Sequence, residues 1–314
     1  MAQVATSPSI SRGAARASAM SRREVAGFST KLPVLVLFLP PALLLFTVFV
    51  ILPMGEAAWY SFYNWNGYLL PTQWVGLRNY ELLFSSLSPF RTALRNNFLI
   101  IAISIGAQLP LAMWLATMAS SRVKGALVFR LIFFLPYVLA DVAAGMIWRF
   151  VYDGDFGLVG GVADVLHVTA PFPLADKNWA MPAILGVVVW KYFGFHMMLF
   201  IAGLQAIDKS VLEAAEIDGA SRWQKFRMVT LPLLGSTVRL SIFFAVVGSL
   251  QLFDMIMPLT GGGPFNSTQT MVTFLYSFGV MRMKVGFGSA VGVALFLICV
   301  TLAFSYKRVF MRHD

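Results

Sequence analysis

Six apolar stretches, each long enough to cross a lipid bilayer as a helix, are the strongest constraint on how this chain folds. They lie near residues 32–55, 98–118, 127–151, 180–204, 233–258 and 285–307. A spanning helix needs about 20 apolar residues. Hydrophobic residues make up 58% of the chain and charged residues 12%, against roughly 25% charged residues in a soluble protein. The sequence therefore predicts an all-α integral membrane protein with six transmembrane helices.

The basic residues lie mostly on one side of these six stretches. They occur in the N-terminal tail, between the second and third stretches, between the fourth and fifth, and at the C-terminus: Arg12, Arg16, Arg22, Arg23, Lys31, Arg122, Lys124, Lys209, Arg222, Lys225, Arg227, Lys307, Arg308 and Arg312. The positive-inside rule therefore predicts that both termini and these two connecting segments are cytoplasmic. The net charge of +10 follows from this bias and does not indicate nucleic-acid binding.

The chain is expected to divide into a tail and a membrane domain. Residues 1–31 are rich in Ser, Ala and Arg, so they are predicted to form a disordered cytoplasmic tail. Residues 32–314 are predicted to form the six-helix transmembrane domain, interrupted by a polar segment at residues 205–232.

The polar segment has the sequence signs of two short helices and a bend. Ser210 with Glu213, and Ser221 with Gln224, have the spacing of capping boxes at two helix starts. Gly219 lies between them, where a left-handed glycine would end the first helix. A folded, bent device in a cytoplasmic loop predicts a soluble protein partner.

The same segment resembles the EAA signature of permease subunits of ABC-type importers, which reads Glu-Ala-Ala, three residues, Gly, nine residues, Ile, one residue, Leu-Pro. The matching residues are Glu213, Ala214, Ala215, Gly219, Leu231 and Pro232, with Val229 in the Ile position. Asp218 and the sequence LTGGGPFNSTQTM at residues 259–271 resemble the carbohydrate branch of that family. The similarity covers nearly all of the chain after the first 30 residues. Pro232 is also expected to set where the next long helix begins.

The resemblance implies a type I ABC importer permease fold in a bacterial inner membrane. It implies a heterodimeric pore with a second permease subunit, two ATP-binding subunits that carry ATP and Mg²⁺, and a periplasmic binding protein for a di- or oligosaccharide. The residues that would couple to the ATPase are Glu213, Ala214, Ala215, Asp218, Gly219, Leu231 and Pro232. Glu213 has two candidate roles, which are pairing with a basic group of the ATPase and capping its own helix.

The chain lacks the sequence signs of catalysis. It contains no HExxH motif, no GxSxG nucleophile elbow and no cluster of metal ligands. No cofactor or metal is therefore expected in this chain, ATP hydrolysis is expected in another subunit, and an integral-membrane enzyme is disfavoured. The other rival is an ion-coupled secondary transporter, in which Asp141 and Asp254 could be proton or sodium sites. The bent loop and the lack of a detectable two-fold repeat argue against it.

Ionisable residues within the predicted spans include Asp141, Lys191, Arg239 and Asp254. Such residues are costly in a membrane and usually face a bundle interior or a water-filled path. Arg239 lies near a cytoplasmic end, where it can reach the interface. Lys191 has two candidate partners that would give it a structural role, Asp141 and Asp254.

A sugar site is expected in the fourth and fifth spans. Sugars are bound by carboxylates and amides together with aromatic rings. The candidates are Gln251 and Asp254 first, then Tyr192 and His196, with the aromatic residues Trp190 and Phe253. By resemblance to maltose-type permeases, the stretch before the Gly-Gly-Gly-Pro turn would line the sugar path. The alternative for each aromatic residue is ordinary helix packing.

Overall fold

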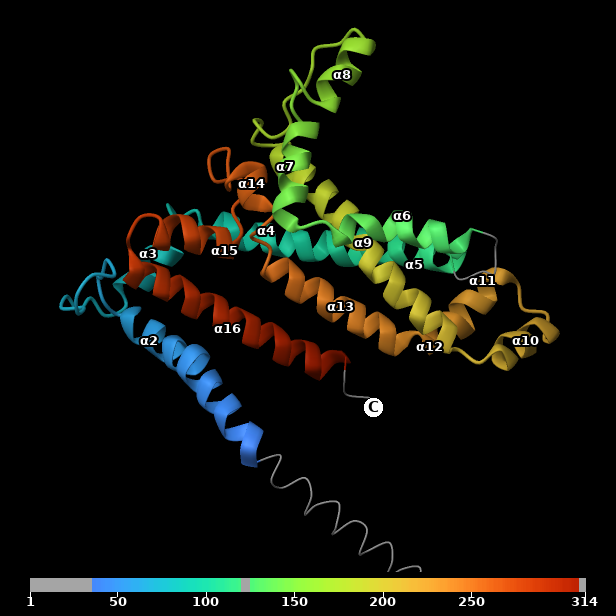
Figure 1. Cartoon of the computed structure of the whole chain (residues 1–314), viewed down its shortest axis with the longest axis horizontal. Coiled ribbons are helices and arrows are strands. Elements are labelled where there is room, and N and C mark those ends of the chain that lie inside the picture. Colours follow the sequence, from blue (N-terminus) through green and yellow to red (C-terminus); the bar gives the residue numbers. More distant parts are fainter. Residues whose placement is uncertain (1–35, 120–124, 311–314) are drawn as a thin grey trace, which may run out of the picture. The chain divides into compact units, whose positions relative to one another are not determined.

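The computed structural model describes residues 36–119 and 125–310. The chain divides into two compact units, one ending at Trp59 and one comprising residues 60–314. The secondary structure of the described residues is helical (Figure 1), apart from an isolated antiparallel bridge between Tyr63 and Trp74. The expected tail, residues 1–31, lies outside the described residues.

The described part of the first unit is a single apolar helix. The chain is helical from Val36 to Tyr60, a length of 25 residues, and includes the π-turn η1 (Thr47–Ile51) and α2 (Leu52–Tyr60). At about 1.5 Å per residue this helix is long enough to cross a bilayer.

The second unit contains the remaining helices. They are α3 (Arg78–Phe84), α4 (Phe90–Ile103), η2 (Ser104–Gln108), α5 (Leu109–Ala119), α6 (Ala126–Val138), α7 (Asp141–Val151), α8 (Leu158–Val165), α9 (Ala180–Ala206), α10 (Lys209–Ile217), α11 (Arg222–Lys225), η3 (Phe226–Thr230), α12 (Leu231–Leu233), α13 (Gly235–Leu250), α14 (Ile256–Thr260), α15 (Met271–Phe274), η4 (Leu275–Val280) and α16 (Val285–Phe310).

Three of the π-turns, η1, η2 and η3, have the same local cause. Each ends immediately before a Leu-Pro pair, whose prolines are Pro53, Pro110 and Pro232. A proline lacks an N–H and its ring clashes with the carbonyl four residues earlier, so the helix widens there. The helix therefore continues through Pro232, and the long helix α13 begins only at Gly235. The expectation that Pro232 sets its start is wrong by one short turn.

Among the described residues, four helices are long and apolar enough to cross a membrane, and two bent pairs bring the number to six if each pair is one span. One pair is α6 with α7, bent by 95°, and the other is the helix Arg222–Leu233 with α13, bent by 70°. The predicted span over residues 127–151 is broken in two, because Leu139 and Ala140 are extended. The predicted fifth span, 233–258, is also too long, since α13 ends at Leu250.

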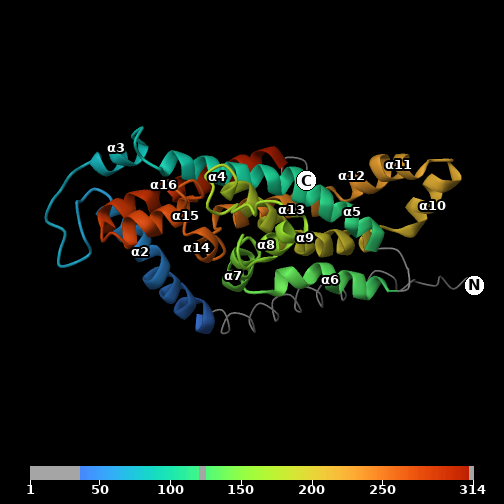
Figure 2. The same cartoon turned by 90° about the horizontal axis from the view of Figure 1, so that it is seen from above.

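Helix α9 is the centre of the second unit. It is apolar around its whole circumference and packs against α4, α5, α6 and α13. Gly194 permits the close approach to α6, since a Cβ atom there would lie 2.0 Å from the carbonyl oxygen of Phe133. Met197 and Phe200 continue this contact in a core shared with α5. Figures 1 and 2 both show α9 beside α5 and α6.

Two adjacent asparagines on α4 hold the segment that follows α14. The Asn96 amide donates to the carbonyls of Ser267 and Gln269 at 2.7 and 2.9 Å. Asn97 donates to the Ser249 carbonyl at 2.7 Å and accepts from the Met271 N–H at 2.8 Å. Both asparagines are buried. They therefore supply partners to backbone groups that no helix satisfies.

Candidate functional site

The EAA segment folds as two short helices joined at a left-handed glycine. Gly219 has φ +76°, and its N–H donates to the Glu216 carbonyl at 3.1 Å, while the Ala220 N–H donates to the Ala215 carbonyl at 3.0 Å. This pair of bonds is the Schellman arrangement that ends a helix. The predicted stop of the first helix at Gly219 is confirmed.

One of the two predicted capping boxes is present. Ser221 and Gln224 bond each other's backbone N–H groups at the start of α11. The box expected at Ser210 and Glu213 is wrong, because Asp208 is the N-cap of α10 and accepts the Ser210 N–H at 2.9 Å. That hydrogen bond lowers the pKa of the Asp208 carboxyl. Glu213 is therefore not used as a cap in this structure.

An ion pair joins the two short helices of the EAA segment. Lys225 at the end of α11 donates to Glu216 near the end of α10, and this hydrogen bond lowers the pKa of the Glu216 carboxyl. Figure 2 shows α10 and α11 at one end of the second unit, beyond the end of α5.

Most of the expected coupling residues are exposed on the surface of the EAA segment. Glu213, Ala214, Asp218 and Gly219 are exposed, as are Leu231 and Pro232 at the bend before α13, and Ala215 is half-buried. In the described part of the chain, the Glu213 carboxylate has no hydrogen bond or ion pair. The arrangement leaves a bent, two-helix surface available to another protein.

The second group of candidate residues lies where α6 breaks from α7. Lys191 on α9 is 1% exposed and donates to the carbonyls of Pro136 and Tyr137, each at 3.0 Å, and to that of Leu139. Its Nζ also lies 3.2 Å from a carboxylate oxygen of Asp141, the first residue of α7. One buried ammonium thus caps the C-terminus of α6 and pairs with the N-terminus of α7.

The partner of Lys191 is therefore Asp141, and the alternative pairing with Asp254 is wrong. Asp141 is 36% exposed and also accepts the hydroxyl of Tyr192 at 2.9 Å. Asp254 has no hydrogen bond or ion pair among the described residues. It is exposed, as is Gln251. Tyr192 thus donates to a carboxylate that is paired with Lys191, whereas the Asp254 carboxylate is unpaired among the described residues.

Gln251, Phe253 and Asp254 occupy the turn between α13 and α14 and are not inside a spanning helix as expected. This turn is fixed by the segment that follows α14, because the Thr270 hydroxyl donates to the Leu252 carbonyl at 3.0 Å. Phe253 packs edge-on against Tyr276, with ring centroids 5.2 Å apart.

The structure separates two of the expected sugar residues from this group. His196 is 3% exposed, and its Nδ1 atom is buried without a hydrogen-bond partner among the described residues. Trp190 packs edge-on against Trp148 on α7, with ring centroids 5.3 Å apart, and borders an apolar core. Both side chains are packed within this chain, whereas Gln251 and Asp254 are not.

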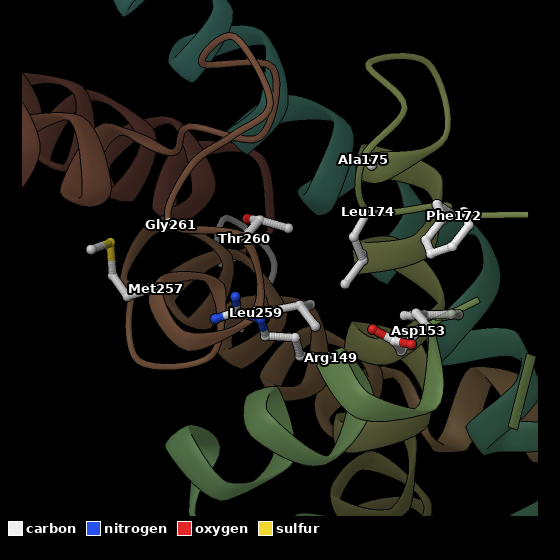
Figure 3. Close-up of a pocket in the computed structure, with 10 residues that line it drawn as sticks. Arg149, Asp153, Phe172, Leu174, Ala175, Met257, Leu259, Thr260 and Gly261 are labelled. Atoms are coloured by element: carbon white, nitrogen blue, oxygen red, sulfur yellow. The ribbon is translucent and has the colours of Figure 1, made fainter. Parts of the chain in front are cut away.

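A separate cavity of about 390 Å³ lies between α7, the segment before α9, and α14. Figure 3 shows Arg149 and Asp153 on one side of it, Phe172 and Leu174 on another, and Thr260 on a third. Asp153 is fixed by the N–H groups of Asp155 and Phe156 at 2.9 and 2.8 Å. The cavity combines an exposed arginine with an apolar wall.

Three residues that build this region were not predicted from the sequence. Asn96 and Asn97 fix the segment behind the turn, and Tyr137 packs beside both Lys191 and Tyr192. An Asn-Asn pair directly before the apolar stretch 98–118 was the available signal for the first two, because buried amides need partners. Within residues 36–119 and 125–310, no three His, Cys, Asp or Glu side chains are grouped as metal ligands.

Comparison with known proteins agrees with these observations. The sulfoquinovosyl glycerol transport system permease protein SmoG of Agrobacterium fabrum is 30% identical over 282 residues, which are 89% of this chain and 91% of that protein. The diacetylchitobiose uptake system permease protein NgcF of Streptomyces coelicolor is 32% identical over 281 residues, 85% of this chain and 79% of that protein.

A solved structure shares the fold. It is a bacterial ABC transporter involved in the import of the acidic polysaccharide alginate, and it superposes with a TM-score of 0.76 at 21% identity, covering 91% of this chain and 99% of that one. The family model described as "Binding-protein-dependent transport system inner membrane component" matches residues 108–312. The resemblance seen in the EAA segment is confirmed, and the chain belongs to this family of ABC transporter permeases.

Proposed function

We propose that this chain is one of two membrane-spanning subunits of an ATP-driven, binding-protein-dependent sugar importer in a bacterial inner membrane. Counting each bent helix pair as one span gives six spans. Six spans place both termini on one side, and the basic residues assign that side to the cytoplasm. The same count places the EAA segment in the cytoplasm and the turn at Gly261 outside.

The geometry of the EAA segment is the observation that carries the proposal. The Schellman bonds at Gly219 fix the end of α10, the Ser221 capping box fixes the start of α11, and the Glu216–Lys225 ion pair joins the two helices. A segment fixed in this way can transmit a push from an ATPase subunit into α13, to which it is joined by the helix Arg222–Leu233. A flexible loop would absorb that motion.

The sugar path is proposed to run past Asp254, Gln251 and Tyr192. Asp254 and Gln251 are exposed acceptors on a turn fixed by Thr270, and Tyr192 packs against the core that includes Leu252 of the same turn. Two relatives carry substrates with sugar groups in their names, sulfoquinovosyl glycerol and diacetylchitobiose, which supports a di- or oligosaccharide here. Trp190, Phe253 and His196 are proposed to support this site by packing.

The remaining partners follow from the proposal. A second permease subunit would complete the pore, two ATPase subunits would carry ATP and Mg²⁺, and a periplasmic binding protein would deliver the sugar. An alginate transporter has been solved in complex with a pentasaccharide-bound periplasmic protein, which supports the last of these. The cavity beside Arg149 lies on the expected outer side, where such a protein would dock.

The experiment that tests coupling is Gly219→Val in the assembled complex. A β-branched residue is strongly disfavoured at φ +76°, so the angle between α10 and α11 should change. We expect the complex to assemble while sugar-stimulated ATPase activity is lost.

The matched control is Gly161→Val on α8, where the backbone φ is not positive and a Cβ atom meets open space. It should leave the activity unchanged. Full stimulation in Gly219→Val would reject the bend as the coupling element.

A further inference from the structure

A long apolar groove runs along α5 and ends at a basic rim. Its volume is about 1640 Å³, larger than the roughly 300–1,000 Å³ of small-molecule pockets. Apolar and aromatic side chains from α5, α9 and α13 form its walls, including Met113, Trp114, Phe200, Leu204, Val238 and Ile242. Four cations also border it: Arg130, Lys209, Arg222 and Lys225.

The length of the groove matches one leaflet of a bilayer. The wall on the α5 side extends from Ile105 to Met118, which is about 20 Å of helix at 1.5 Å per residue. Half of a bilayer's hydrocarbon core is about 15 Å thick. The groove could therefore hold an acyl chain over its whole length and leave a headgroup at the rim.

Two of the four cations are not used within the described chain. Arg130 donates to the Ala119 carbonyl at 2.8 and 3.2 Å, and Lys225 pairs with Glu216. Lys209 and Arg222 are exposed and form no ion pair among the described residues. Positive charge at the end of an apolar groove is complementary to a phosphate joined to acyl chains.

An exposed tryptophan at the rim also indicates the headgroup level of the membrane. Trp223 follows Arg222 on α11, lines the groove and is 66% exposed. Tryptophan side chains favour the boundary between headgroups and acyl chains. The rim therefore has both the charge and the aromatic residue expected at a lipid headgroup.

We propose that this groove is a binding site for one anionic phospholipid, with an acyl chain along α5 and the phosphate at Lys209 and Arg222. The site joins the start of α10 to the start of α11, so a bound lipid would brace the EAA segment against the membrane. This assignment adds a ligand to the chain that sugar import does not require.

The test is a lipid count on the purified complex by native mass spectrometry. The wild-type complex in mild detergent is expected to retain phosphatidylglycerol or cardiolipin at this chain. Each cation beside an anionic headgroup contributes about fivefold, so Lys209→Glu with Arg222→Glu should lower retention at least roughly 25-fold. Thr117→Trp, which fills the groove without changing charge, should also release the lipid.

The matched control is Lys307→Glu with Arg308→Glu. These residues lie in the last turn of α16, are exposed and carry the same change of charge, but do not line the groove. The control should retain the lipid. Equal loss in the control and rim variants would show only general attraction to anionic lipid, and unchanged retention in the rim variant would also overturn the site.

A second measurement identifies a competing occupant. Met118 lines the groove. A cross-link from the Met118→Cys variant to another subunit would overturn the proposal in favour of a protein helix in the groove. Lipid retention is measured without a transport assay. The lipid site and the proposed sugar import can therefore be rejected independently of each other.

Discussion

Replacing Lys191 with Met should be among the most damaging single changes in the chain. The substitution removes an ammonium that is 1% exposed and that serves three backbone carbonyls and Asp141. Removing one partner of a buried ion pair typically costs about 3–5 kcal/mol. The released carbonyls lie at the break between α6 and α7, so the 95° bend should relax as well.

The paired change Asp141→Asn should cost much less. Asp141 is less buried than Lys191, with 36% of its side chain exposed against 1%, and an asparagine can still accept the Tyr192 hydroxyl. Lys191 would keep its three carbonyl partners. We expect a loss of roughly 1–2 kcal/mol for this variant. The asymmetry between the two partners is the specific consequence of the geometry.

The assay is thermal unfolding of the purified permease complex, together with its yield. At about 2–4 °C per kcal/mol for a domain of this size, Lys191→Met should lower Tm by about 6–20 °C. Lys177→Met makes the same substitution at an exposed lysine and should leave Tm nearly unchanged. A Lys191→Met complex with normal yield and Tm, or one less damaged than Asp141→Asn, would refute this account of the break.

Three further predictions address the sugar path, the packing behind it and the EAA segment. Asp254→Ala should cut sugar uptake about tenfold at unchanged complex yield, with Asp164→Ala as the exposed control, and a loss of yield would assign Asp254 a structural role. Asn97→Leu should strand the Ser249 carbonyl and the Met271 N–H and cost about 1–3 kcal/mol for each group, measured as a lower Tm. Lys225 lowers the pKa of the Glu216 carboxyl. The contact between α10 and α11 should therefore persist above pH about 4.3 and weaken as the pH falls through that lowered pKa. Spin-label distances between the two helices should lengthen on acidification, and a distance that does not change would contradict this role of the ion pair.

The sequence predicted those features that depend on local chemistry. Apolar length located the helices long enough to cross a membrane. The positions of Gly219 and Ser221 located the stop of α10 and the start of α11, because each requirement is met by residues a few positions apart. The cap of α10 was misassigned since Asp208 and Ser210 are both good N-cap residues two positions apart. Only the structure decides between them.

The features that were missed depend on contacts distant in sequence. The break at Leu139 and Ala140 contains no glycine or proline, and it is stabilised by Lys191, about 50 residues away. The choice of Asp141 over Asp254 as its partner depends on where α7 starts. For the same reason the end of α13 at Leu250 could not be predicted, because Asn97 on α4 binds the carbonyl of Ser249.

The most direct test of the central claim is sugar uptake by proteoliposomes that contain this chain with its partner permease and ATPase subunits. We predict that uptake requires ATP and the loaded binding protein and continues after ionophores collapse the proton and sodium gradients. Uptake that proceeds without ATP, stops when those gradients collapse and needs no binding protein would contradict the account and assign Asp141 and Asp254 to an ion-coupled transporter.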